Sequence, residues 1–142
     1  MAEQMTPEER RAFLGEGTRT GKLATMRADG RPHVVPIWFV LDGDDIIFMT
    51  GANTVKGRNL QRDGRVALSV DDQQPPYSFV TVEGTIAYAD NPPEALEWST
   101  RIARRYMGAD LAESFGRRNA VEGELLVRIT PTKIIATKNL AD

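Results

Sequence analysis

Residues 46–60 read IIFMTGANTVKGRNL, an apolar strand followed by a loop of small residues and the start of a short helix. Gly51 and Ala52 in the loop carry no bulky side chain, so their amides can turn towards an anion. Thr54 is placed to cap the helix. Lys56 then falls in the first helical turn, where free N–H groups and the helix dipole favour negative charge. The segment therefore predicts a phosphate site on a strand–loop–helix unit.

A second cation, Arg58, follows two residues after Lys56. That spacing separates the two side chains by roughly 200° around a helix, so they cannot share one face. Arg58 can instead reach a different oxygen or a carboxylate. The sequence leaves open which of the two residues holds the phosphate and whether the other is simply solvated.

Turn signals divide the rest of the chain into short segments with the spacing of an antiparallel meander. Asp29-Gly30 and Asp63-Gly64 are turn dipeptides, and residues 42–45 read DGDD. Gly84 lies inside a strand that is long enough to bend, where glycine suits a bulge or a barrel corner. The predicted strands are 23–27, 33–41, 46–50, 65–70, 78–88, 124–130 and 134–137, and the predicted helices are 7–14, 92–107 and 109–117. The pattern indicates a mainly β fold with flanking helices and a closed or nearly closed barrel.

Two helices carry recognisable start signals. Residues 6–9 read TPEE, a capping box with proline at the first helical position, and residues 91–94 read NPPE, which predicts Asn91 as an N-cap. The inward stripe of the longer helix is predicted to be Ala95, Ser99, Ile102 and Tyr106. Its arginines are expected to face water, with a polyglutamate-tailed cofactor as the alternative partner; they are Arg101, Arg104 and Arg105.

The segment 34–40, VVPIWFV, is apolar on both faces of its predicted strand. One face can line the barrel core while the other packs under a helix, or the outer face with Trp38 can form a dimer interface. Pro36 removes a ladder donor, so it predicts a sheet edge or a local break. There, free backbone groups of Val35 and Ile37 can face a planar ring.

The composition limits the classes of function. A length of 142 residues suits one domain, which we place at 1–142. A formal net charge of −2 with interspersed signs argues against nucleic acid as a partner. The chain has no cysteine and only one histidine, His33, so a metal site or a Ser-His-Asp triad is not expected.

The sequence also predicts where the protein acts. The first residues, MAEQ, lead directly into the predicted first helix, with no pattern of a signal peptide. No apolar run approaches the roughly 20 residues that a membrane-spanning helix needs. The absence of cysteine is compatible with a reducing compartment, and we expect a cytoplasmic protein without a membrane partner.

Four segments in one order carry a family resemblance: residues 21–25 (GKLAT), 29–33 (DGRPH), 50–60 and 82–85 (VEGT). Over residues 10–138 the chain resembles the pyridoxamine-phosphate-oxidase-like flavin and deazaflavin oxidoreductases. Within that family it is most similar to the actinobacterial deazaflavin-dependent branch, in which a Lys-x-Arg-Asn-Leu segment follows the third strand.

The resemblance implies a six- to seven-stranded antiparallel split β-barrel of the FMN-binding type. It also implies a homodimer with the cofactor in a groove between subunits, its phosphate on residues 50–59, and Tyr77 as a lid residue from the partner subunit. Many members place a further arginine ahead of the lysine, where this chain has Asn53 and Thr54. The cofactor-binding residues predicted in this way are Val35, Pro36, Ile37, Thr50, Gly51, Ala52, Lys56, Arg58, Asn59, Tyr77 and Ser78.

The activity implied by the resemblance is hydride transfer from reduced coenzyme F420 to an unsaturated small-molecule acceptor, with no catalytic side chain required. FMN is the main alternative cofactor, because it also offers a phosphate and a flat tricycle, and it would allow oxidase chemistry. A non-catalytic module that stores the cofactor or a tetrapyrrole-like ligand is a third possibility, and a structural dimer without ligand is a fourth.

Overall fold

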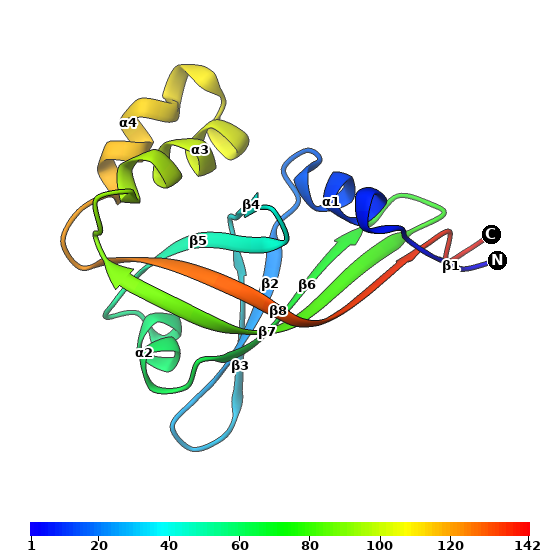
Figure 1. Cartoon of the computed structure of the whole chain (residues 1–142), viewed down its shortest axis with the longest axis horizontal. Helices are drawn as coiled ribbons and strands as arrows, with labels where there is room; N and C mark the ends of the chain where they lie inside the picture. The colour runs from blue at the N-terminus through cyan, green and yellow to red at the C-terminus, as the bar shows by residue number, and fades with distance from the viewer.

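The computed structural model describes all of residues 1–142 as one antiparallel sheet with four helices (Figure 1). The elements in chain order are β1 (Glu3–Gln4), α1 (Pro7–Gly15), β2 (Gly21–Met26), β3 (Pro32–Ile37), β4 (Val40–Asp42), β5 (Asp45–Gly51), α2 (Val55–Arg62), β6 (Arg65–Asp72), β7 (Ser78–Asp90), α3 (Ala95–Met107), α4 (Ala109–Asn119) and β8 (Glu124–Lys138). The fold is the expected split β-barrel, with eight strands instead of six or seven, because the two-residue β1 also pairs with β8.

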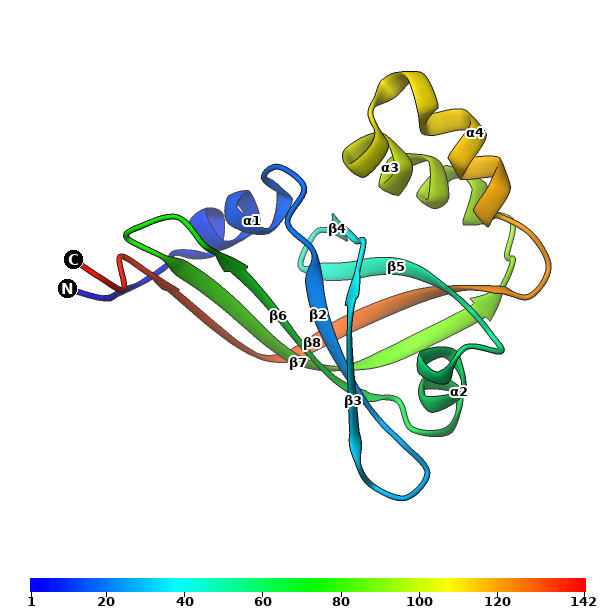
Figure 2. The same ribbon diagram turned by 180° about the vertical axis from the view of Figure 1, so that it is seen from behind.

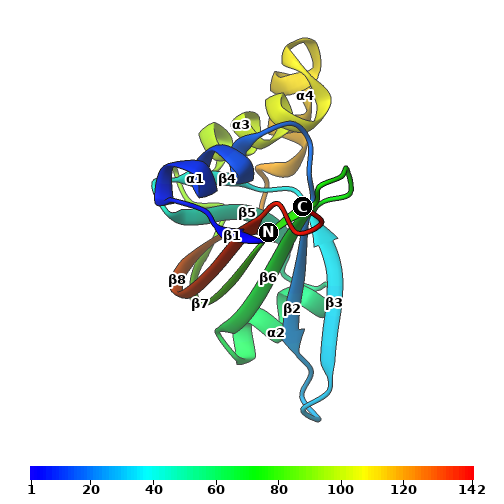
Figure 3. The same ribbon diagram turned by 90° about the vertical axis from the view of Figure 1, so that its right-hand side faces the viewer.

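The strand order explains why the sheet curls. The order is β3-β2-β6-β7-β8-β5-β4, so β3 and β4 lie at opposite ends of the hydrogen-bonded path. They are nevertheless consecutive in sequence, joined only by Trp38 and Phe39. A link of two residues can span at most about 10 Å between Ile37 and Val40, so the two edges must approach one another. The sheet therefore closes into a barrel that is split between β3 and β4. Figure 3 shows the two ends of the sheet, with β3 beside β2 and β4 beside β5.

The predicted strand 33–41 is thus two strands, β3 and β4, with a break after Ile37. Pro36 lies on β3, which pairs only with β2, so the prediction of a sheet edge is confirmed. An edge suits proline because its missing amide donor faces away from the ladder.

At the last strand the opposite happened, because two predicted strands are one strand in the structure. The segments predicted at 124–130 and 134–137 form one continuous strand, β8, which pairs with β5, β7 and β1. Gly84 does mark the predicted bulge, since the register of β7 against β8 shifts between Glu83 and Gly84. A Cβ at Gly84 would lie 2.5 Å from the carbonyl oxygen of Thr130, so the two backbones approach more closely there than any other residue allows.

A cluster of 16 buried apolar residues fills the barrel. Its fully buried members come from β2, β5, β6, β7, β8, α2 and the link between β3 and β4. The largest are Phe39, Phe48, Leu23, Ile46, Leu60 and Leu68. No helix of the structure is long and apolar enough to cross a membrane.

The helices cap and flank this barrel. α1 begins at the predicted capping box, in which Thr6 accepts from the Glu9 amide and Glu9 accepts from the Thr6 amide. α3 begins at Ala95 and not near Asn91, which has a positive φ of 37° and caps nothing. The stripe predicted to face inward includes three buried residues, Ala95, Ser99 and Ile102, and a partly exposed Tyr106. α3 and α4 pack as a hairpin beyond β4 and β5 (Figure 1).

Candidate functional site

A cleft of about 300 Å³ opens between the barrel and the α3–α4 hairpin. Its walls come from the end of β3, from β5, α2, α3 and α4, and from the first residue of β8. The lining residues are Pro36, Ile37, Trp38, Met49, Lys56, Ser99, Ile102, Ala103, Asn119 and Glu124. Half of them are apolar, and Lys56 and Glu124 are the only two that carry charge.

The turn from β5 into α2 positions Lys56. Thr54 is the N-cap as predicted: its hydroxyl accepts from the Gly57 amide at 3.0 Å and donates to the Gly51 carbonyl at 2.8 Å. A Cβ at Gly57 would lie 2.1 Å from that same carbonyl oxygen, so the turn requires glycine at this position. The tight turn leaves Lys56 in the first turn of α2, half-buried and directed into the cleft.

The loop amides are less available than expected. The Ala52 amide, which we predicted to face an anion, donates to the Gly123 carbonyl at 2.8 Å. Thr50 is 4 % exposed, and its hydroxyl lies 3.3 Å from that of Thr54. The prediction that Ala52 offers its N–H group to a phosphate is therefore wrong, because that donor is used to hold the loop against the start of β8.

Lys56 has no hydrogen-bond or ion-pair partner in the protein. Burial lowers the pKa of its ammonium group, while the charge of Glu124 raises it in part. The converse holds at Glu124, where burial raises the pKa of the carboxyl, Lys56 lowers it and Asp90 raises it again. The cleft thus holds a partly desolvated cation that a bound anion would stabilise.

Arg58 lies on another side of α2, as the helical spacing predicted. It lines a separate cleft of about 310 Å³ with two further arginines, Arg27 and Arg62. Asn59, which lies between Arg58 and Arg62 in sequence, is 3 % exposed and holds the helix in place. Its side-chain amide nitrogen donates to the Thr25 hydroxyl at 3.0 Å, and its Oδ1 accepts from Arg62 at 2.7 Å. Only Lys56 of the two predicted cations lines the central cleft.

Trp38 supplies the one aromatic ring of the cleft lining. Trp38 is 39 % exposed and stacks on Tyr106 with ring centroids 5.0 Å apart and planes 4° apart. The Tyr106 hydroxyl donates to the Arg19 carbonyl at 2.8 Å and accepts from the Phe39 amide at 3.2 Å, and burial raises its pKa. Pro36 lies beside Trp38 in the cleft wall, whereas Val35 is not among the lining residues.

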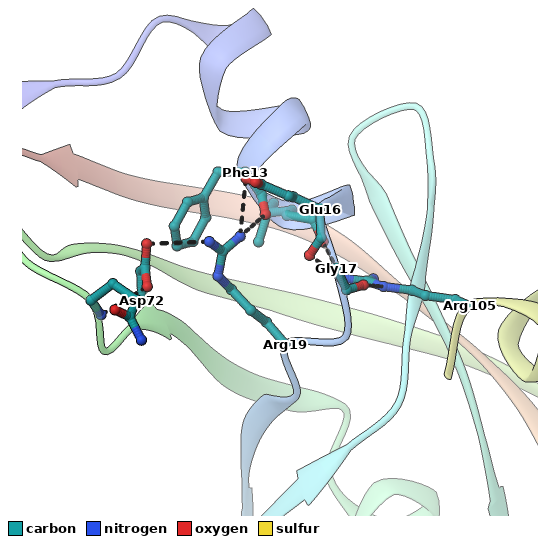
Figure 4. Close-up of polar contacts among 8 residues, drawn as sticks. Phe13, Glu16, Gly17, Arg19, Asp72 and Arg105 are labelled. Atoms are coloured by element: carbon teal, nitrogen blue, oxygen red, sulfur yellow. Dashed lines mark hydrogen bonds and ion pairs between the residues drawn. The ribbon is translucent and has the colours of Figure 1, made fainter. Parts of the chain in front are cut away.

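The helix arginines behave differently from one another. Arg101 is exposed and pairs with Glu97, as expected of a solvated face. Arg105, also predicted to face water, instead donates to four backbone carbonyls: to Leu14 and Phe39 at 2.7 Å, to Gly17 at 2.9 Å and to Glu16 at 3.4 Å. Figure 4 shows its guanidinium directed at the loop after α1, next to Arg19 and its partners Glu16 and Asp72. Arg105 therefore ties α3 to the rest of the barrel.

The whole-chain comparison agrees with this geometry, since the family model described as pyridoxamine 5'-phosphate oxidase matches residues 6–138. The chain belongs to the pyridoxamine 5'-phosphate oxidase family. No curated protein matches it in sequence.

Three solved structures extend the comparison of this pyridoxamine 5'-phosphate oxidase family member. The conserved hypothetical protein Rv2991 from Mycobacterium tuberculosis is 30% identical, with a TM-score of 0.81 over 93% of this chain and 84% of its own. A structure described as F420 reductase is 26% identical, with a TM-score of 0.68 over 87% of this chain and 94% of its own. A putative pyridoxamine 5'-phosphate oxidase from Listeria innocua, at 18% identity and a TM-score of 0.70 over 91% of this chain and 96% of its own, shares the fold.

Two predicted site residues lie far from the cleft within one chain. Tyr77 and Ser78 lie at the turn between β6 and β7, at the end of the sheet beside the termini and away from α2 (Figure 2). The Tyr77 carbonyl accepts from the Leu140 amide at 3.1 Å, and its ring is exposed. Within one chain, Tyr77 and Ser78 do not contribute to the central cleft. That they complete the cleft of a second subunit stays a prediction.

The structure also adds residues that the sequence did not indicate. Glu124, Asn119 and Ser99 line the cleft with Lys56, although they are 43 to 68 residues away in sequence. No local signal marks them, because their position depends on where the α3–α4 hairpin and the start of β8 pack. The assembled cleft suits the cofactor type of the family: it offers an unpaired cation for an anionic group and a flat wall for an aromatic ring.

Proposed function

We propose that this protein is an oxidoreductase that binds coenzyme F420 and reduces an unsaturated small organic acceptor. The observation that carries the proposal is Lys56, a half-buried cation without a protein partner at the edge of a cleft with an apolar, flat-sided wall. The likeness to a structure described as F420 reductase supports the choice of cofactor.

In this proposal the protein binds and orients the cofactor and excludes water from it. Lys56 holds the phosphate by a charge-assisted hydrogen bond, and Trp38, Pro36 and Ile37 lie along the ring system. When bound and reduced, F420 supplies a hydride from its C5 atom. The apolar half of the cleft keeps water from the reacting atoms, and no side chain is asked to act as nucleophile.

The proposal includes a homodimer in the cytoplasm in which Tyr77 and Ser78 of one subunit complete the cleft of the other. This arrangement would give a role to an aromatic side chain that is exposed in the single chain. The acceptor must then enter from the side of the cleft that the ring leaves open.

FMN is the second candidate, because the description of the family names an oxidase and FMN presents the same combination of phosphate and flat ring. The two cofactors support different reactions. A reduced flavin reacts readily with oxygen, whereas the deazaflavin is a two-electron hydride carrier. A module that binds the cofactor or a tetrapyrrole without turnover is distinguished by the absence of acceptor-dependent consumption.

The test is a pair of fluorescence titrations of ligand-free protein with F420 and with FMN, followed by an acceptor screen. F420 binding with consumption of the reduced cofactor supports the proposal. Preferential FMN binding would replace it with a flavin oxidoreductase, and F420 binding without consumption by any acceptor class would favour the module.

The role of Lys56 is tested by Lys56→Ala, with Arg58→Ala as the matched control from another side of the same helix. We expect Lys56→Ala to weaken cofactor binding by roughly 1.5–3 kcal/mol, the size of a charge-assisted hydrogen bond, without loss of fold stability. Arg58→Ala should weaken it less, because Arg58 lines a different cleft. Equal losses, or a collapse of the melting midpoint in Lys56→Ala, would count against the proposed phosphate site.

A further inference from the structure

The central cleft is lined by one side chain of each charge. Among its lining residues the only cation is Lys56, and the only anion is Glu124. The two are not in direct contact, but each affects the pKa of the other, so they are electrostatically coupled across the cleft. Asp90 lies close enough to Glu124 to add negative charge on the same side.

No second cation is available to offset Glu124. Arg58 lines the other cleft, and Arg105 is occupied by four backbone carbonyls. At the start of α2 the amides of Gly57 and Arg58 already donate to the side chain and the carbonyl of Thr54, which leaves only the uncharged amides of Val55 and Lys56 beside the lysine. An anion held by Lys56 therefore meets one positive and one negative side chain.

We propose that Glu124 is a specificity-determining residue that favours a phosphodiester with one negative charge over a phosphomonoester with nearly two. The inference rests on the proposed function in one respect, that Lys56 holds the phosphate. A monoester carries about −1.5 to −2 at pH 7 because its second pKa is near 6, whereas a diester keeps a single charge.

The physical reason is the extra charge. Lys56 can neutralise one negative charge of the ligand, and any second charge interacts with Glu124 without compensation. In a cleft that is partly shielded from water, like charges a few ångströms apart repel strongly enough to change affinity by tenfold or more. FMN carries its phosphate as a monoester and F420 as a diester, so Glu124 separates the two candidate cofactors, which Lys56 alone cannot do.

The test compares two ligands that share one ring system, FMN and riboflavin 4′,5′-cyclic phosphate, which is a singly charged diester. Dissociation constants of both are measured at pH 7.5 by flavin fluorescence for the wild type and for Glu124→Gln. We expect the affinity ratio of FMN to cyclic diester to rise by about tenfold in Glu124→Gln. Because each ligand is compared with itself, differences in phosphate shape cancel.

Glu122→Gln is the matched control, since Glu122 is an exposed carboxylate two residues away and does not line the central cleft. It removes the same net charge and should leave the ratio unchanged. An equal rise in Glu122→Gln would mean that overall charge is responsible and would overturn the inference. An unchanged ratio in Glu124→Gln, or no measurable FMN binding by either protein, would also overturn it.

Glu124→Ala is the second variant, in case the amide disturbs the start of β8, and circular dichroism checks the fold of each protein. The same tenfold rise is expected from Glu124→Ala. The experiment contains no F420, so failure of the wild type to bind F420 would refute the proposed function while leaving the role of Glu124 to be decided by the flavin ratio.

Discussion

Arg105 is predicted to be one of the main stabilising contacts between the α3–α4 hairpin and the barrel. Its guanidinium donates to the carbonyls of Leu14, Gly17 and Phe39 at 2.7–2.9 Å and stacks over the rings of Phe39 and Tyr106. The carbonyl partners come from two separate parts of the chain, the end of α1 with the loop after it and the link between β3 and β4. Truncation to alanine removes these three short hydrogen bonds at once, together with a longer one to the Glu16 carbonyl at 3.4 Å, and leaves the carbonyls dependent on water.

The size of the effect follows from those bonds. A hydrogen bond to a charged group contributes about 1.5–3 kcal/mol when buried, and because this side chain is only partly buried we take about 1 kcal/mol for each. Arg105→Ala should therefore lower the free energy of unfolding by about 3 kcal/mol. Arg105→Lys should lose about 2 kcal/mol, since an ammonium group cannot reach three carbonyls in a planar fork.

Urea unfolding at one fixed protein concentration measures the change, and with a slope of about 2 kcal/mol per molar the midpoint should fall by about 1.5 M. Arg104→Ala is the control, because Arg104 is exposed and makes no such contact, and it should change stability by less than about 0.5 kcal/mol. A loss below about 1 kcal/mol in Arg105→Ala, or an equal loss in Arg104→Ala, would refute the reasoning.

Three further predictions concern the turn from β5 into α2, the α3–α4 hairpin and the free energy of unfolding at low pH. Gly57→Ala should destabilise the fold by about 3 kcal/mol or more, although alanine usually favours a helix by about 1 kcal/mol, because its Cβ would lie 2.1 Å from a carbonyl oxygen; urea unfolding checks the sign. Gly116→Ala should lower the melting temperature by pushing α3 from α4, since its Cβ would lie 2.3 Å from the Thr100 hydroxyl, and a melting curve unchanged within 1 °C would contradict this. The side-chain hydrogen bond from Arg65 lowers the pKa of Asp63 from 3.8 to about 2, so the pair stabilises the fold above pH 3.8 and this contribution is lost as the pH falls towards 2. Asp63→Asn should therefore flatten the pH dependence of the free energy of unfolding between pH 3.8 and 2. An unchanged slope in that range would count against this role of the pair.

The strand pattern was predictable from sequence because its signals are local. Asp29-Gly30 and residues 42–45 each set a hairpin within a few residues, and both hairpins are present. Gly84 was recognisable as a bulge for the same reason. The break after Ile37 was less visible, because an unbroken apolar run hides the point at which the chain crosses from one sheet edge to the other.

The site was predictable only where it is local. Thr54 and Lys56 take the positions that helix capping requires, and those positions follow from the order of neighbouring residues. Glu124 and Arg105 could not be found in that way. The carbonyl partners of Arg105 are 66 to 91 residues away in sequence, so a solvated helix face and a buried anchor look identical before the chain folds.

The short helix α2 is held at its start by the Thr54 cap and in its middle by the buried hydrogen bond from Asn59 to Thr25. The backbone that bears Lys56 is therefore already in its binding geometry, and a ligand has to order only the methylene chain of one lysine. A receptor prepared in this way has little to rearrange on encounter. Ligands of different affinity should then enter at similar rates and differ in how long they stay, so residence times will rank the candidate cofactors more sharply than association rates.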